Sequence, residues 1–86
     1  GHRPAVVLTP KAYNQATGLL ICCPLTTKIK GYPFEVIIEG TPQNVALSDQ
    51  VKSLDWKARK AKHKGSVSQA ELETIKQKIG LLLAIS

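Results

Sequence analysis

The segment Pro24-Leu25-Thr26-Thr27-Lys28-Ile29-Lys30-Gly31-Tyr32-Pro33-Phe34 joins two apolar runs, residues 19–23 before it and residues 34–38 after it. It carries two threonine hydroxyls, two lysines and a glycine. Loops held between buried strands often carry function, and hydroxyl and ammonium groups donate well to phosphate oxygens. The plainer interpretation is a loop that is polar only because it faces water, and sequence physics alone favours it.

The strands around this loop follow from short apolar runs. Residues 5–8, Ala-Val-Val-Leu, lie between two prolines and predict the first strand, with Arg3 at its start. Residues 11–18 are polar and end in a glycine, which predicts a loop containing at most one helical turn. Residues 19–23 predict the second strand, which we expect to end at Pro24 because proline cannot donate to a strand ladder.

The chain after the polar loop predicts two more strands. Residues 34–38, Phe-Glu-Val-Ile-Ile, form the third expected strand, and residues 39–44 are a cluster of turn-forming residues. Residues 45–47 and 50–51 predict a fourth strand that is interrupted by the pair Ser48-Asp49.

A strongly basic segment then follows, and its cations fall within thirteen residues: Lys52, Lys57, Arg59, Lys60, Lys62 and Lys64. If residues 57–64 form a strand, cations lie on both of its faces, which predicts an exposed edge strand. Lysines on an edge strand prevent unwanted strand pairing, and contact with a phosphate backbone is an equally weighted alternative. Trp56 lies inside this segment, and a tryptophan is more often a core or interface residue than a platform for base stacking.

The last element is an amphipathic helix. Ser68-Gln69-Ala70-Glu71 is a capping box, in which the serine hydroxyl and the glutamate carboxylate each accept a backbone N–H at the helix start. Leu72, Ile75, Ile79 and Leu82 follow at spacings of three and four residues and predict one apolar stripe. The sequence therefore predicts a single domain over residues 1–86: a small, mostly antiparallel sheet, curled or barrel-like, with a C-terminal helix.

Composition limits the classes of function. The formal net charge of +6 favours an anionic partner, namely nucleic acid, an acidic protein segment or a membrane surface, although a basic surface also serves solubility alone. No apolar run approaches the roughly 20 residues that a membrane span needs. Cys22 and Cys23 are adjacent and so point to opposite faces of a strand, which argues against a disulfide and favours a reducing compartment. His2 and His63 sit in no metal-ligand pattern, so we expect no zinc site.

The candidate chemistry rests on Arg3 and Thr26. The sequence contains no glycine-rich phosphate loop and no nucleophile elbow. In RNA the 2′-hydroxyl is its own nucleophile, so an enzyme needs mainly to orient it and to stabilise the pentacoordinate phosphate. If the first two strands pair antiparallel, Arg3 at the start of one lies near Thr26 at the end of the other, and the two side chains could flank one phosphate.

Several motifs in this order closely resemble one branch of a known toxin family. They are Gly1-His2-Arg3-Pro4-Ala5-Val6-Val7-Leu8, Tyr13-Asn14, Thr17-Gly18, Pro24-Leu25-Thr26-Thr27, Lys30-Gly31-Tyr32-Pro33-Phe34-Glu35-Val36, Val45-Ala46-Leu47-Ser48-Asp49-Gln50-Val51-Lys52-Ser53 and Trp56-Lys57-Ala58-Arg59. Together they resemble the MazF branch of the MazF/PemK toxins of bacterial toxin–antitoxin pairs. The resemblance runs nearly end to end and includes the C-terminal helix.

The resemblance implies a fold and an activity. The fold is the SH3-like barrel of the MazF/PemK/CcdB toxins, assembled as a homodimer. The activity is that of a cytoplasmic bacterial endoribonuclease, independent of metals and other cofactors, which cuts single-stranded mRNA at short sequence motifs and so inhibits translation and growth. Cleavage uses the 2′-hydroxyl and leaves a cyclic phosphate and a 5′-hydroxyl. The implied protein partner is a cognate MazE-like antitoxin whose acidic tail occupies the RNA groove.

The resemblance also assigns residues. Arg3 matches the family's catalytic arginine and Thr26 its catalytic threonine. The loop of residues 28–32 matches a segment implicated in RNA contact, and Asp49 matches a position that some relatives use in RNA binding or catalysis. With the cations of the basic segment, the expected RNA-binding residues are Lys28, Lys30, Tyr32, Asp49, Lys52, Lys57 and Arg59.

Relatives carry a first strand and a mobile loop before the Gly-His-Arg-Pro motif, so we expect this chain to be N-terminally incomplete, with an open barrel edge and part of the RNA site missing. Two alternatives to a ribonuclease therefore stay open. One is a catalytically impaired basic barrel that binds RNA or an acidic antitoxin tail without cleavage. The other is a gyrase inhibitor, because another toxin family shares this fold.

Overall fold

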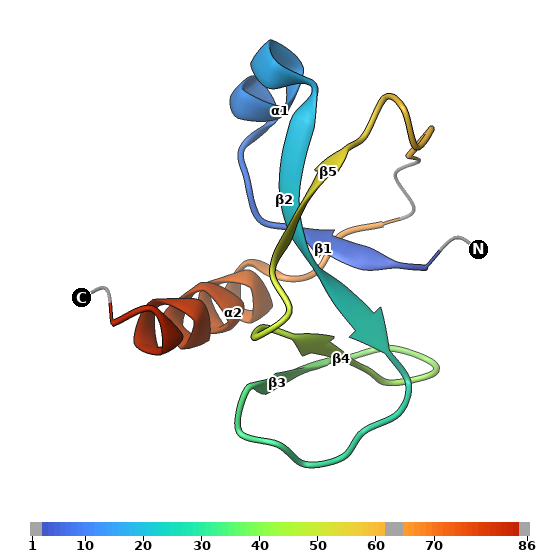
Figure 1. The fold of residues 1–86 in the computed structure, drawn as a ribbon. Coiled ribbons are helices and arrows are strands. Elements are labelled where there is room, and N and C mark those ends of the chain that lie inside the picture. The colour runs from blue at the N-terminus through green and yellow to red at the C-terminus, as the bar shows by residue number, and fades with distance from the viewer. Residues whose placement is uncertain (1–2, 62–64, 85–86) are drawn as a thin grey trace.

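The computed structural model describes residues 3–61 and 65–84. Its elements follow in chain order: β1 (Ala5–Val7), α1 (Lys11–Thr17), β2 (Leu19–Thr26), β3 (Glu35–Ile38), β4 (Asn44–Leu47), β5 (Lys52–Asp55) and α2 (Gln69–Leu82) (Figure 1). Every strand pair is antiparallel. The predicted architecture, a small antiparallel sheet with a C-terminal helix, is confirmed.

Strand β2 is the centre of the sheet because it pairs with three neighbours. Along its first part it lies between β1 and β5, and at its end it pairs with β4, which in turn pairs with β3. One long strand is thus shared by two smaller sheets, and in Figure 1 it runs from α1 down to the loop that precedes β3. This sharing produces the curled, barrel-like arrangement.

The prediction that the second strand ends at Pro24 is wrong, and the ladder shows why. Leu8 N donates to Ile21 O at 2.7 Å, and Leu25 N donates to Pro4 O at 3.0 Å. Odd-numbered residues of β2 therefore direct their N–H groups toward β1, and Pro24 directs its nitrogen to the opposite side. On that side β2 pairs with β5 up to Cys22 and with β4 from Leu25 onward. Pro24 lies between these two pairings, so no partner strand needs a hydrogen bond from its nitrogen.

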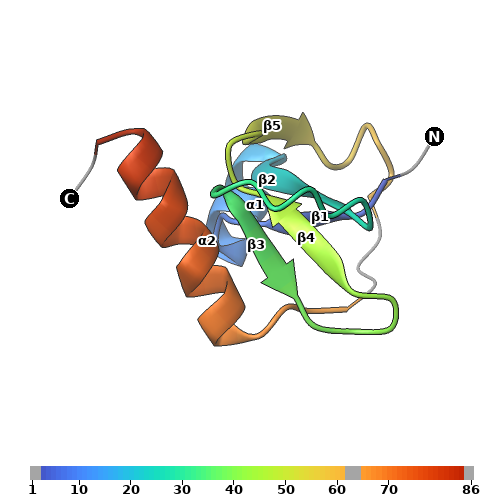
Figure 2. The same cartoon turned by 90° about the horizontal axis from the view of Figure 1, so that it is seen from below.

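The core lies on one face of β2, between the sheet and α2. The buried cluster contains Val6, Cys23, Val36, Ile38, Ala46 and Ile75. Helix α2 lies along β3 in Figure 2, and Leu72, Ile75 and Ile79 of the predicted stripe contact this cluster. Leu82 departs from the prediction because it is 55% exposed, so the last turn of the helix extends past the core.

The start of α2 is fixed by the predicted capping box and by one contact that the sequence does not reveal. Ser68 Oγ accepts Glu71 N at 3.0 Å, and Glu71 Oε1 accepts Ser68 N at 2.8 Å. The second carboxylate oxygen of Glu71 accepts Glu39 N at 2.9 Å, just beyond β3. The backbone hydrogen bonds from Ser68 and Glu39 lower the pKa of Glu71 below its ordinary value. The helix start and the end of β3 are therefore held by one side chain.

Two local predictions are corrected. Residues 11–17 form a helix of seven residues rather than a loop, and it ends at Gly18, whose φ of 73° is the left-handed conformation that glycine adopts readily. Gln50 and Val51 lie outside any strand, because β4 ends at Leu47 and β5 begins at Lys52.

The expected basic strand of residues 57–64 is also wrong over its described part. Residues 56–60 form a turn, in which Lys60 N donates to Lys57 O at 3.2 Å and Lys60 has a φ of 52°. Residues 62–64 lie outside the described residues, and so do His63 and His2, on which the sequence analysis commented.

Candidate functional site

The register of β1 and β2 places Arg3 beside Thr26. Ala5 lies opposite Pro24, and the hydrogen bond from Leu25 N to Pro4 O continues the ladder by one step. Extending this register by one more residue sets Arg3 opposite Thr26, on one face of the sheet. Side chains at directly opposed positions have Cβ atoms roughly 4.5–5.5 Å apart. The antiparallel pairing that the sequence analysis assumed for these two strands is confirmed.

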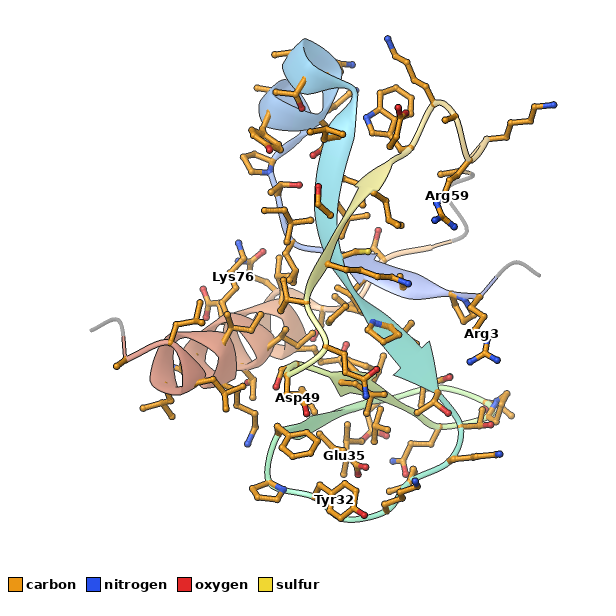
Figure 3. All side chains as sticks on the ribbon, viewed as in Figure 1. Arg3, Tyr32, Glu35, Asp49, Arg59 and Lys76 are labelled. Atoms are coloured by element: carbon orange, nitrogen blue, oxygen red, sulfur yellow. The ribbon has the colours of Figure 1, made fainter. Side chains whose placement is uncertain are left out.

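The local bonding of Thr26 leaves its hydroxyl proton available. Thr26 Oγ1 accepts Lys28 N at 3.1 Å, so the oxygen is already fixed by the loop that follows β2. The hydroxyl hydrogen is therefore free to donate to a different acceptor. Arg3 is exposed at the start of β1 (Figure 3). The Thr26 hydroxyl is a neutral donor, and the Arg3 guanidinium is a positively charged donor with several N–H groups. Both can donate to the same anion.

Two further cations belong to this face. Lys52 of β5 lies opposite Cys22 in the β2–β5 register, on the same side of the sheet as Thr26. Burial raises the pKa of the Cys22 thiol above its ordinary value, and the positive charges of Lys52 and Arg59 partly oppose that rise. We call this surface the site face; it is defined by Arg3, Thr26, Lys52 and Arg59. All four side chains can donate hydrogen bonds to an anion.

Arg59 is carried by the turn that follows β5, and several bonds hold this turn. Asp55 Oδ1 accepts Ala58 N at 2.9 Å, and Asp55 O accepts Arg59 N at 3.1 Å. The indole Nε1 of Trp56 donates to Asn14 O of α1 at 2.8 Å. Trp56 is therefore a packing residue, as predicted. Figure 3 places Arg59 on the same side of the molecule as Arg3.

Lys57 occupies a different position in the same turn. Its ammonium lies 5.5 Å from the centroid of the Trp56 ring, which is the geometry of a cation–π contact. The predicted RNA-binding residues of the basic segment thus divide into two kinds. The charge of Arg59, like that of Lys52, acts on the pKa of the Cys22 thiol, and Lys57 lies over the Trp56 ring.

Lys28, Lys30 and Tyr32 lie in the loop between β2 and β3, residues 27–34, and all three are exposed. The ring of Tyr32 contacts the ring of Phe34, with centroids 5.5 Å apart and planes tilted by 39°. Tyr32 is nevertheless 51% exposed, so a face of the ring stays open to an aromatic ligand. This loop begins directly at Thr26 and continues the site face below it.

Asp49 comes from a different part of the fold than Arg3, and Figure 3 shows the two side chains well apart. It sits in the turn between β4 and β5 and lines a shallow apolar groove together with Ser48, Val51, Ile79, Leu82 and Leu83. Within one chain the structure therefore does not join Asp49 to Arg3 and Thr26.

The cysteines contribute packing rather than reactive thiolates. Cys22 and Cys23 are fully buried, free and on opposite faces of β2. Burial raises the pKa of Cys23 to about 11. Among residues 3–61 and 65–84, no group of three or more His, Cys, Asp or Glu side chains is arranged to hold a metal ion. Neither helix in this part of the chain is long and apolar enough to cross a membrane.

Comparison with known proteins decides the family. The sequence profile of the PemK-like, MazF-like toxins of type II toxin–antitoxin systems matches residues 1–83. The chain belongs to this family. The resemblance drawn from its motifs is thereby confirmed.

Characterised members of the MazF-like family support this membership. The endoribonuclease toxin MazF of Escherichia coli K12 is 56% identical over 84 residues, covering 96% of this chain and 76% of that protein. A MazE–MazF crystal structure from Deinococcus radiodurans has a chain that is 42% identical with a TM-score of 0.93, covering 99% of this chain and 88% of that one. A structure of MazF from the same organism gives 43% identity and a TM-score of 0.91, with coverages of 98% and 78%.

Sequence reasoning missed one side chain that contacts the loop carrying Lys28, Lys30 and Tyr32. Glu35, the first residue of β3, accepts hydrogen bonds from the backbone of the loop of residues 27–34. The available signal was an acidic residue directly after a cationic, glycine-containing loop. Glu35 was interpreted only as part of the apolar strand. Its carboxylate binds backbone N–H groups, and a sequence pattern of side chains does not reveal such a contact.

Proposed function

We propose that this chain is the endoribonuclease toxin of a type II toxin–antitoxin pair and that it cleaves single-stranded mRNA at short sequence motifs. The observation that carries the proposal is the register that sets Arg3 opposite Thr26. Membership of the MazF-like family and 56% identity to a protein named endoribonuclease toxin MazF support it.

The chemistry assigned to the site face is transesterification within the RNA. The 2′-oxygen forms a bond to phosphorus and loses its proton, and the bond from phosphorus to the 5′-oxygen breaks while that oxygen gains a proton. The products are a 2′,3′-cyclic phosphate and a 5′-hydroxyl. Arg3 stabilises the charge on the phosphorane and assists proton transfer by hydrogen bonding. Thr26 donates its free hydroxyl proton to a phosphoryl oxygen.

RNA binding is assigned to the cations and the aromatic ring around this pair. Lys52 and Arg59 on one side and Lys28 and Lys30 on the other contact neighbouring phosphates, since phosphate contacts set the register of a nucleic acid without reading its bases. Tyr32 supplies a ring on which an unpaired base stacks. Lys57 adds positive charge at the margin.

We also propose the partners and location that the family implies: a homodimer in the bacterial cytoplasm, inhibited by a MazE-like antitoxin whose acidic tail competes with RNA. The net charge of +6 supports an acidic competitor. Large exposed apolar side chains support the dimer, namely Val51, Leu81, Leu82 and Leu83 beside the groove that contains Asp49. Sedimentation equilibrium measures the oligomeric state directly.

The test is cleavage of a long single-stranded RNA by this chain in the presence of EDTA, with the product ends mapped. We expect discrete cuts at a short motif, with 5′-hydroxyl ends. Arg3→Ala should abolish the cuts while leaving the circular dichroism spectrum unchanged. If the folded wild-type chain binds RNA but does not cleave it, the protein is a binding module. If Arg3→Ala keeps full cleavage activity, the assignment of the site is contradicted.

A further inference from the structure

We propose that Glu35 is a positioning residue for the RNA-binding loop, residues 27–34: its carboxylate fixes the loop backbone so that Lys28, Lys30 and Tyr32 are presented together. The proposal rests on the proposed function of this loop. Glu35 itself does not touch the substrate in this account.

The carboxylate of Glu35 gathers two successive backbone N–H groups. Glu35 Oε1 accepts Gly31 N at 2.9 Å and Lys30 N at 3.3 Å, and Oε2 accepts Lys30 N at 3.2 Å. Successive N–H groups that converge on one anion form the concave backbone arrangement that also binds phosphate in other proteins. Here the chain fills that arrangement with its own carboxylate, so the loop is ordered before any ligand arrives.

The backbone conformation of the loop requires a glycine at this point. Gly31 has a φ of 80°, in the left-handed region that other residues adopt only with strain. A Cβ atom added there would meet no atom within 4 Å. The requirement is therefore conformational and not steric, and it identifies the turn at Gly31 as the feature that Glu35 stabilises.

Most of the remaining contacts of the loop lie at its two ends, and within its second half Tyr32 O accepts Glu35 N at 3.1 Å. Thr26 Oγ1 accepts Lys28 N at the start of the loop. At the far end Ser48 Oγ and the ammonium of Lys78 donate to the carbonyl oxygens of Phe34 and Pro33. Among the hydrogen bonds of the described residues, those that the Glu35 carboxylate accepts are the ones that hold the N–H groups of Lys30 and Gly31, in the middle of the loop.

If Glu35 acted only through its negative charge, its removal would change RNA binding in the opposite direction. The direction of the change in RNA affinity therefore tests the proposal. A negative charge among cations that bind phosphate weakens binding of RNA, so removing it should tighten binding. If Glu35 instead orders the loop, removing its charge weakens binding. Glu35→Gln brings an amide N–H₂ donor toward the Lys30 N–H donor and so disrupts the carboxylate contact without a large change in volume.

The experiment measures KM and kcat for a short single-stranded RNA that carries the mapped cleavage motif. For Glu35→Gln we expect KM to rise by about fivefold or more, since charge-assisted hydrogen bonds are stronger than neutral ones. We expect kcat to stay within about twofold, because Arg3 and Thr26 are placed by the β1–β2 register rather than by this carboxylate. The thermal midpoint should change little, since the contact is at the surface.

Glu39→Gln is the matched control. It removes the same charge at the other end of β3, where the Glu39 carboxylate accepts only a weak 3.5 Å contact from Gln43. We expect its KM to be unchanged or slightly lower. Gly31→Ala is an independent test of the loop conformation, and it should raise KM in the same direction as Glu35→Gln.

The outcomes separate this proposal from the proposed function. Cleavage by the wild-type chain together with an unchanged or lower KM for Glu35→Gln would overturn the positioning role and leave the ribonuclease intact. No cleavage and no RNA binding by the folded wild-type chain would overturn both. A fall in kcat with KM unchanged would also contradict the proposal, because it would place Glu35 in the chemical step.

Discussion

Replacing Thr26 by valine separates the catalytic from the structural role of its hydroxyl. Valine has nearly the same shape and suits a strand, so the β2 ladder should persist. The replacement removes the acceptor for Lys28 N, which is exposed and can bond to water instead. The stability loss should therefore not exceed the roughly 0.5–1.5 kcal/mol of an ordinary hydrogen bond.

The expected loss of activity is much larger. Removing one preorganised donor to a developing oxyanion typically lowers kcat by about 10²–10³-fold, equivalent to about 2.7–4 kcal/mol. A loss of about 1 kcal/mol from a domain stable by about 5–15 kcal/mol leaves almost every molecule folded. Unfolding therefore cannot account for a hundredfold effect.

The assay is single-turnover cleavage with saturating enzyme, and affinity is measured separately with a 2′-O-methyl RNA that lacks the nucleophile. Thr27→Val is the matched control, because Thr27 is the exposed neighbour just beyond the strand. We expect Thr27→Val to cleave at nearly the wild-type rate. If folded Thr26→Val cleaved within about threefold of wild type, the inference that its hydroxyl acts on the phosphate would be refuted.

Three further predictions concern the site and the core. Arg3→Lys keeps the charge but loses the planar fork, so RNA affinity should hold while kcat falls by about 100-fold or more, as measured in the same single-turnover assay. Ile75→Ala empties a fully buried position and should lower the free energy of unfolding in urea by about 2–5 kcal/mol, whereas Leu81→Ala, at a site 80% exposed, should change it by less than about 0.5 kcal/mol. The pKa of Glu71 is lowered in the folded chain, so its contribution to stability is present above its ordinary value of 4.5 and is lost as the pH falls through the folded value. Urea unfolding followed toward pH 3 should therefore show a shallower loss for Glu71→Gln than for wild type, and equal slopes would contradict the capping contact.

The elements that were predictable are those whose signal is local. The capping box at Ser68 and Glu71 specifies the start of α2 completely, because both partners lie within four residues. The apolar runs located β1 and β3 to within a residue. Arg3 and Thr26 were brought together by one assumption, that consecutive strands pair antiparallel, and the register bears it out.

The errors arose where tertiary context decides. Helix α1 buries no residue and has no side-chain N-cap, so its sequence carries no periodic signal beyond the glycine that ends it. Pro24 stays within β2 because its nitrogen faces the exchange between two partner strands, which no single-sequence rule reveals. The turn after β5 is a different kind of error, because its signal was local: the carboxylate of Asp55 accepts Ala58 N only three residues along the chain, as a turn-forming aspartate does.

The sharing of β2 between core and site has a consequence for insertions and deletions. Alternate residues of this strand serve opposite purposes: Cys23 faces the core cluster, while Thr26 and the face above Cys22 carry the candidate chemistry. Losing or gaining one residue within 20–25 would slip the strand by one position and exchange its two faces, so that Thr26 would turn toward the core cluster and Cys23 away from it. The same change at residues 28–30 would alter only loop length. Natural length variation in such chains should therefore be confined to the loop and be absent from the strand that it follows.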